Sequence, residues 1–388
     1  MKKLILALGT AFLATGAVHA FETQGGLEAW RSYRGVSWDG QRFAGSTQAP
    51  IAGLHFDRAG RAFVSTPRLL SGAAPATLSL LDLERQDGLA HLRAFPSVEG
   101  NAVAGPAGEA LRNVLGFYVD DRNGWVWVLD MGFVAGEAEA PRGAQKLNVY
   151  EQASGKLVKS IPLDGVADRK GSFLNDVAVD EGRRLAYLSD SGVRSAPDNQ
   201  AGIIVVDFAA GSARRVLHRH PSVLPEPGAK VVSHGVEALP GQPLRIGING
   251  IALSPDGQTL YWTVTTGTGL YAAPAALLRD PAAAPATVGA SVRRVADIGG
   301  NTDGIAFGAD GRLYVTNVTR NGITAFDPAS GKLAGAWSHE AIFWPDTADA
   351  RPDGLYFVVN HLNGHFAGAV KEGEERYAIW RLATPAAR

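Results

Sequence analysis

A two-strand motif recurs six times along this chain, and this recurrence constrains the fold more than any other feature. Each copy has a small or polar residue, an apolar strand, a turn that contains glycine, and a second strand rich in apolar and aromatic residues. The copies begin at Ala52, Leu115, Asn175, Asn249, Asp303 and Asp346. Short alternating segments that turn on glycine are typical of antiparallel strands. We therefore predict an all-β fold built from repeats around one axis.

A second hairpin follows most copies of the motif. Two apolar strands flank a turn with Ser or Ala next to glycine, around Gly155, Gly211 and Gly331. Four strands per repeat and six repeats predict a six-bladed β-propeller with four-stranded blades. The remaining length falls in segments 136–143, 218–241 and 272–290, which are rich in Ala, Pro, Gly and charge and which we expect to be surface excursions.

The two ends of the chain are expected to close the ring. A propeller has no free edges when its last blade is completed by strands from both termini. The segment Tyr377–Leu382 has the pattern of a terminal strand, and we expect it to pair with part of residues 27–38. Residues 21–388 are then one domain.

The first twenty residues have the composition of a signal peptide. Lys2 and Lys3 precede the apolar run Leu4–Ala14, and Val18-His19-Ala20 is a small-x-small cleavage site. We expect residues 1–20 to be removed. The mature chain would be periplasmic or secreted, and it has no other apolar stretch long enough to span a membrane.

Charge and cysteine content exclude several classes of function. With 37 basic and 38 acidic residues the formal net charge is −1, so a nucleic-acid partner is not expected. The chain has no cysteine, which excludes disulfides, thiolate catalysis and cysteine zinc sites.

Four copies of the repeat place an oxygen-bearing side chain at the same position. This position starts the innermost strand of a blade, and it holds Asn175, Asn249, Asp303 and Asp346, whereas the first two copies have Ala52 and Leu115. In a closed ring the four side chains converge at one mouth of the channel. Carboxylate and amide oxygens favour a hard divalent cation, and calcium in particular. The alternative is that each one is an ordinary turn residue bonded to local amides.

A second polar set ends the returning strand of the same repeats. Antiparallel pairing brings that end back to the same face. Its members are Asp130, Asp190, Thr265, Asn317 and Asn360. We predict that they contact a ligand, with Trp344 as an aromatic wall; Tyr271 could form such a wall, although both aromatic residues could instead pack between blades.

Short stretches around these positions resemble the Yellow and major royal jelly protein family, of which the chain is identified as a bacterial member. The matching stretches are Thr66-Pro67-Arg68, Pro75-Ala76-Thr77-Leu78, Trp127–Gly132, Phe173–Asp180, Tyr187–Gly192 and Trp344–Thr347. The resemblance implies a six-bladed propeller, export and a small-molecule pocket at the channel entrance. Members of the family include proteins with proposed dopachrome-converting activity and proteins that bind biogenic amines.

Two of the motifs are also similar to those of the gluconolactonase and regucalcin group. Asn249-Gly250-Ile251 and Asp303-Gly304-Ile305 match residues that, in that group, ligate a divalent metal, with the Asp assisting attack of water on a lactone. Asn175-Asp176 is similar to an Asn-Asp pair that contacts metal-bound water or substrate there. The group takes a further Glu ligand from its first blade, where this chain has Ala52.

Two hypotheses of function follow from this site. The first is an exported protein that binds a small molecule beside a calcium ion. The alternative is a metal-dependent lactonase or a dopachrome-type isomerase in which Asp303 is the general base. A protein-interaction platform is a third possibility, but it leaves the aligned polar residues unexplained.

Overall fold

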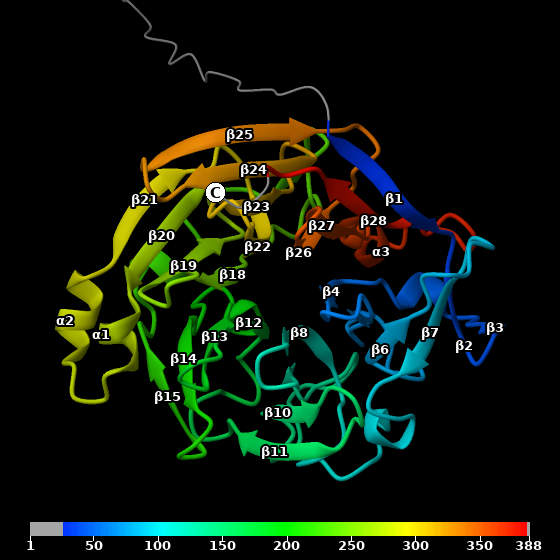
Figure 1. Ribbon diagram of the computed structural model, residues 1–388, viewed down its shortest axis with the longest axis horizontal. Coiled ribbons are helices and arrows are strands. Elements are labelled where there is room, and N and C mark those ends of the chain that lie inside the picture. Colours follow the sequence, from blue (N-terminus) through cyan, green and yellow to red (C-terminus); the bar gives the residue numbers. More distant parts are fainter. Residues whose placement is uncertain (1–25, 386–388) are drawn as a thin grey trace, which may run out of the picture.

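The computed structural model describes residues 26–385 and shows a ring of six blades around a common axis (Figure 1). Five blades contain four antiparallel strands each, and the first is widened to six strands. The predicted all-β, six-bladed propeller is therefore confirmed. The predicted signal peptide, residues 1–20, lies outside the described residues. No helix among residues 26–385 is long and apolar enough to cross a membrane.

Strands occupy the same relative place in every blade. The innermost strands are β4 (Gly53–Phe56), β8 (Val114–Asp120), β12 (Leu174–Asp180), β18 (Ile248–Leu253), β22 (Thr302–Phe307) and β26 (Pro345–Arg351). The second strands are β5 (Ala62–Ser65), β9 (Trp125–Asp130), β13 (Leu185–Asp190), β19 (Thr259–Val264), β23 (Leu313–Asn317) and β27 (Gly354–Val359). The third strands are β6 (Leu78–Leu81), β10 (Lys146–Glu151), β14 (Gly202–Asp207), β20 (Gly269–Pro274), β24 (Gly322–Asp327) and β28 (Tyr377–Leu382). The outer strands are β7 (Ala90–Ala94), β11 (Leu157–Pro162), β15 (Ser212–Val216), β21 (Arg293–Asp297), β25 (Lys332–Ser338) and β1 (Leu27–Tyr33).

The outer hairpins turn where the sequence places glycine. Gly155, Gly211 and Gly331 have φ of 71°, 66° and 67°, in the left-handed region that glycine enters without a steric penalty. They connect β10 to β11, β14 to β15 and β24 to β25. The local chemistry of the turn therefore fixes the length of these hairpins.

Both ends of the chain build the sixth blade. Strand β1 pairs with β28 along Leu27–Tyr33, and β28 pairs with β27. The predicted pairing with residues 27–38 holds for the first part of that range. Strand β2 (Val36–Trp38) instead runs parallel to β7, and β3 (Gln41–Arg42) pairs with β2, so these two strands widen the first blade.

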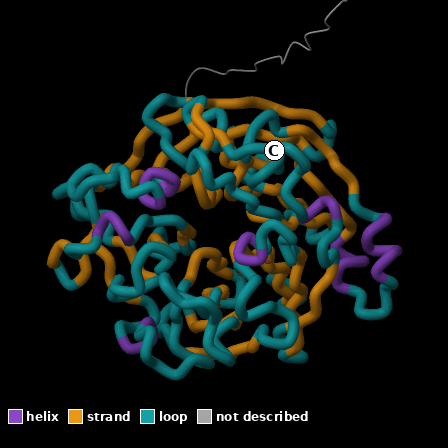
Figure 2. The backbone as a smooth tube through the Cα atoms, turned by 180° about the vertical axis from the view of Figure 1, so that it is seen from behind, coloured by secondary structure: helices purple, strands orange, loops and turns teal. Residues whose placement is uncertain are grey.

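Segments between the strands carry the few helices and one extra hairpin. Of the expected excursions, 272–290 contains α1 (Ala275–Arg279) and α2 (Pro285–Ala290), and 218–241 contains the hairpin β16 (Val232–Ser233) and β17 (Val236–Glu237). Helix α3 (Leu362–Phe366) follows β27. The 3₁₀ turns are η1 (Ser46–Gln48), η2 (Glu99–Asn101), η3 (Val193–Ser195) and η4 (Pro221–Val223). Figure 2 shows the molecule from behind, with these segments as loops and short helices attached to a ring of strands.

The hydrophobic core lies between blades rather than along the axis. Trp127, Trp262, Tyr187 and Tyr314, all on second strands, are fully buried. Apolar clusters join neighbouring blades. The aligned polar residues of the inner strands face the channel, where the cavity described below lies.

Candidate functional site

Each of the four inner strands that carry an aligned polar residue has a β-bulge at that residue, and the bulge directs the side chain toward the axis. The antiparallel register shifts between Leu174 and Val177, between Ile248 and Ile251, between Thr302 and Ile305 and between Pro345 and Ala348. The extra residues are those that begin the repeat, so Asn175, Asn249, Asp303 and Asp346 all sit in a bulge. A bulge locally redirects a side chain away from the regular pleat. The same shift occurs in β8 at Leu115.

Glycine follows two of the four bulged residues and lets the neighbouring inner strands approach closely there. A Cβ on Gly250 would lie 2.4 Å from the carbonyl oxygen of Asp303, and one on Gly304 would lie 2.9 Å from that of Asp346. Distances below 3.0 Å do not occur for real Cβ atoms, so only glycine fits where the strands remain in place. The Asn-Gly and Asp-Gly pairs of the sequence thus fix the diameter of the ring where the polar residues meet.

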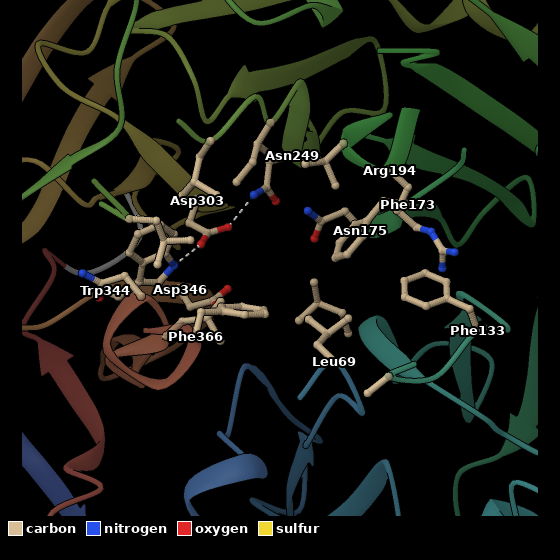
Figure 3. Close-up of a pocket in the computed structure, with 18 of the residues that line it drawn as sticks. Leu69, Phe133, Phe173, Asn175, Arg194, Asn249, Asp303, Trp344, Asp346 and Phe366 are labelled. Carbon is tan, nitrogen blue, oxygen red and sulfur yellow. Dashed lines mark hydrogen bonds between the residues drawn. The ribbon is translucent and has the colours of Figure 1, made fainter. Parts of the chain in front are cut away.

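The four residues predicted to hold a metal line one cavity of about 400 Å³. Figure 3 shows Asn175, Asn249, Asp303 and Asp346 arranged around one side of it. Apolar side chains contributed by loops and by helix α3 line the rest of the cavity. Leu69, Phe133, Phe173, Leu239, Leu244 and Phe366 belong to this second group.

Neutral groups alone donate hydrogen bonds to the two carboxylates. Asp303 Oδ1 accepts from Asn249 Nδ2 at 2.6 Å, and its Oδ2 accepts from Trp344 Nε1 at 2.7 Å. Asp346 Oδ2 accepts from Asn360 Nδ2 at 2.9 Å. Both acids are at least 94% buried, so two carboxyl groups lie close together with no ion-pair partner among the described residues.

Burial disfavours ionisation of both acids. It raises the pKa of Asp303 to about 7, against the opposing effect of the bonds from Trp344 and Asn249. Burial, followed by the nearby charge of Asp303, raises the pKa of Asp346 well above its usual value. A carboxyl group with a pKa near neutrality can exchange a proton at physiological pH.

The two asparagines present oxygen atoms to the cavity. Asn249 uses Nδ2 for both Asp303 and Thr265 Oγ1, at 2.6 and 2.8 Å, and Figure 3 shows its amide oxygen turned toward Asn175. The Asn175 side chain has no hydrogen-bond partner within residues 26–385, and it is 6% exposed. Both amides are therefore free to contact a ligand or an ion.

Trp344 is held in an uncommon backbone conformation. Its φ is 57°, in the left-handed region that a bulky residue seldom enters. Its side chain is 3% exposed, lines the cavity and donates to Asp303. Strain of this kind is often kept at functional sites. The predicted aromatic wall is thus present at Trp344, whereas Tyr271 lies outside the residues that line the cavity and donates to Glu226 at 3.1 Å.

The returning-strand acids lie outside the cavity lining, each paired with a base. Asp130 accepts from Lys146 Nζ at 2.7 Å and from the amides of Arg112, Asn113 and Gly132. Asp190 accepts from Arg215 Nη2 at 2.5 Å and from the amides of Phe173 and Gly192. Both aspartates are fully buried. They hold the loops that carry the cavity wall, and neither lines the cavity.

The other members of the returning-strand set also bond neighbouring residues and do not line the cavity. Thr265 accepts from Asn249, and Asn360 bonds Asp346 and the Leu362 amide at the start of α3. Asn317 bonds Thr324 and the Arg320 amide. None of the three lines the cavity among the described residues. Thr265 positions Asn249, Asn360 positions Asp346, and Asn317 holds a turn of the fifth blade.

The residues that sequence reasoning missed come from outside the repeat. Phe133 and Arg194 follow the second strands of blades two and three, Leu239 and Leu244 lie after the inserted hairpin, and Phe366 ends α3. Phe133 and Arg194 lie in equivalent loops after Asp130 and Asp190, but the residue types at the matching positions differ, so alignment of the repeats gave no shared signal. In the sequence, only the length of the insertions 136–143 and 218–241 indicated that loops could contribute residues to the cavity.

The donor set fits a hard divalent cation. Two carboxylates and two amide oxygens face one space, and their charge has no Lys or Arg partner. Calcium accepts such oxygen ligands and completes its shell with water. No group of three or more His, Cys, Asp or Glu side chains within residues 26–385 is arranged to hold a metal, so the amides and water would have to supply the rest. Asn175, Asn249, Asp303 and Asp346 are the residues that would hold it.

Asp176, next to Asn175, faces a different cavity. It lines a space of about 290 Å³ together with His55 and Asp349. Its carboxylate accepts from the amides of Val177 and Ile251. The ligand-contacting role that the lactonase resemblance implied for the Asn-Asp pair therefore does not extend to Asp176 in this site.

Comparison with known proteins gives a family and a fold. The family described as Major royal jelly protein matches residues 114–339, which is more than half of the chain. No curated protein matches the sequence significantly.

Solved structures that are similar to the chain are distant in sequence. A luciferin-regenerating enzyme has a TM-score of 0.52 at 10% identity, with 87% of this chain and 92% of that chain covered. A PQQ-bound aldose sugar dehydrogenase from Streptomyces coelicolor has 0.51 at 13%, covering 92% and 97%. A structural-genomics target described as a candidate gluconolactonase has 0.50 at 13%, covering 87% and 90%. At these identities the likeness extends to the propeller fold alone.

Proposed function

Because the chain belongs to the major royal jelly protein family, we propose that it binds a small molecule in the cavity at the channel mouth, beside a calcium ion held by Asn175, Asn249, Asp303 and Asp346. The predicted signal peptide supports a periplasmic or secreted location for this activity. The ligand would rest against the apolar loop residues with its polar end toward the ion.

One observation carries this proposal. Asp303 and Asp346 are buried side by side, and their hydrogen-bond donors are neutral amide and indole groups. Two uncompensated buried charges are costly. A divalent cation in the space that they share would neutralise both, and it would explain why Asn175 and Asn249 present amide oxygens there.

A calcium titration of the chelator-treated protein tests the site. We expect isothermal titration calorimetry to show one calcium bound per chain in the natural protein and none in D303N/D346N. The matched control is D39N, which changes an exposed aspartate of the first blade outside this cavity and should bind calcium normally. Equal binding by D303N/D346N and the natural protein would refute the ligand assignment.

A second candidate function, lactone hydrolysis, is favoured by the pKa of Asp303. A group with a pKa of about 7 that faces a cavity can accept a proton from a water molecule as that water attacks a carbonyl carbon. The cation, when bound, would polarise the carbonyl. Trp344 and Asn249 would hold the carboxylate in place during proton transfer. The position of the first-blade acid is taken by Ala52, which is fully buried.

A substrate screen separates the two functions. Five- and six-membered lactones and a dopachrome-type substrate should be turned over by the natural protein and not by D303N if the site is catalytic. Saturable binding of a small molecule without turnover of any of these compounds would leave binding as the function.

A further inference from the structure

The wall of the cavity that faces away from the two acids carries a single basic residue. Arg194, on η3, lines the cavity with Phe133, and its guanidinium lies 3.7 Å from the centre of that ring. Figure 3 shows Arg194 and Phe133 together on one side and Asp303 and Asp346 on the other. The cavity is therefore polarised, with positive charge at one end and carboxylates at the other.

Arg194 is held by backbone carbonyls and keeps one donor unused. Its Nε donates to Lys170 O at 3.0 Å, and its Nη2 donates to Ala138 O at 2.7 Å and to Glu137 O at 3.2 Å. Its Nη1 is buried without a hydrogen-bond partner among the described residues. A buried donor that lacks an acceptor costs free energy. Because this nitrogen is buried, an acceptor on a ligand would reach it after a rotation of the Arg194 side chain toward the cavity.

The one acid near Arg194 is already engaged. Glu137 Oε1 accepts from Arg112 Nη2 at 2.6 Å, and its Oε2 accepts from the Val134 amide at 3.0 Å. The Arg194 bonds that fix the guanidinium go to neutral carbonyl groups. Its positive charge is consequently balanced less completely than that of Lys146 or Arg215, each of which bonds a buried aspartate directly.

The surface between the two ends is apolar. Phe173 and Leu69 lie between Arg194 and the acids in Figure 3, and Phe366 lies beside Asp346. Phe366 is 43% exposed although it is a large apolar side chain. Aromatic side chains at such a position favour a flat ligand body.

From this arrangement we propose that the natural ligand is an organic anion: a flat, largely apolar body with an acidic group at Arg194 and a neutral oxygen group directed to Asp303 and Asp346. The inference rests on the proposed small-molecule site, and it makes Arg194 the residue that selects acids over neutral analogues. A guanidinium is suited to this role because it keeps its positive charge at physiological pH, and its remaining donor can make a charge-assisted hydrogen bond.

Matched acid and amide probes test the selection. The probes are 4-hydroxyphenylacetate and 3-(4-hydroxyphenyl)propionate, each compared with its primary amide; two chain lengths are used so that either span of the cavity can be matched. Binding to the full chain is measured by calorimetry with calcium present. We expect the natural protein to bind one of the acids about tenfold more tightly than its amide, as for a charge-assisted hydrogen bond.

Variants of Arg194 separate recognition from a structural role. R194Q should reduce the preference for the acid to twofold or less while leaving the affinity for the amide within twofold, and R194K should retain part of the preference. The matched control is R142Q, which removes the same charge from an exposed arginine on a neighbouring loop and should behave as the natural protein. Equal weakening of acid and amide in R194Q would mean that Arg194 only braces its loop, and this would overturn the proposal.

The remaining outcomes are also decisive. An acid preference that persists in R194Q would place the acidic group on the cation, which overturns the role of Arg194 and leaves the proposed function intact. Failure of all four probes to bind a protein that still binds calcium would overturn the inference alone. An Arg194-dependent preference in a protein that does not bind calcium would support the inference and refute the proposed metal site.

Discussion

Two pairs of buried aspartates in this propeller differ in what neutralises them. Asp130 and Asp190 end returning strands, and the chain supplies Lys146 and Arg215 as their partners. Asp303 and Asp346 begin inner strands, and their donors are asparagine and tryptophan side chains. All four are buried. The comparison separates buried acids that the chain neutralises with its own base from buried acids beside a cavity that it leaves without one.

The largest effect is expected when the buried ion pair between Asp130 and Lys146 is broken. K146M leaves Asp130 buried without its base, and removing one member of a buried ion pair costs about 3–5 kcal/mol. We expect urea unfolding to show a loss of that size. A loss below about 1 kcal/mol in K146M would show that the three backbone amides suffice for Asp130. The double variant D130N/K146M serves as the control and should recover part of the loss.

The second prediction concerns pH and the calcium-free protein. The pKa of Asp303 is raised from its usual 3.8 to about 7 on folding, so the folded state holds its proton more tightly than the unfolded state. This contribution to stability is fully present below pH 4 and is lost as pH rises through 7, by up to about 4 kcal/mol. The free energy of unfolding, followed from pH 4 to 8 in chelator, should fall more in the natural protein than in D303N. Parallel profiles would contradict the raised pKa.

Calcium should reverse that loss. A ligand that binds only the folded state stabilises it by about 2.7 kcal/mol at one hundred times its dissociation constant. We therefore expect calcium to raise the midpoint of thermal unfolding at pH 8, and to leave D303N/D346N unchanged. The D130N variant retains all four proposed ligands, so it should still respond to calcium, and a missing response there would show that the two pairs of acids are not independent.

The smallest expected effect removes one hydrogen bond. W344F keeps an aromatic ring at the cavity wall but takes the indole donor away from Asp303 Oδ2. We expect calcium affinity to fall about fivefold, equivalent to about 1 kcal/mol, because the carboxylate is no longer held in one orientation. W337F, in a residue packed near Tyr314 and outside the cavity, is the control. An unchanged affinity in W344F would mean that Asn249 alone orients Asp303.

The repeat explains why the fold and part of the site could be predicted from the sequence. Asn175, Asn249, Asp303 and Asp346 occupy one register position, and a ring brings equal positions together. The bases that neutralise Asp130 and Asp190 could not be predicted in this way, because Lys146 and Arg215 lie on third and fourth strands at unequal distances along the chain. Arg194 lies in a loop whose counterpart in the second blade has Val134 at the same distance from the aspartate that ends the strand. The sequence period therefore predicted the inner strands. The partners of side chains that depend on loop conformation could be identified only from the three-dimensional structure.

The way the ring closes has a consequence for engineering. The amide of Ala383 donates to the carbonyl of Gly26 at 2.7 Å, so the start and the end of the described chain are adjacent. A short peptide could join them, and new termini could be opened in an exposed connection between two other blades. A circular permutant of this kind would move the break out of the sixth blade while every inter-strand bond of the ring is kept.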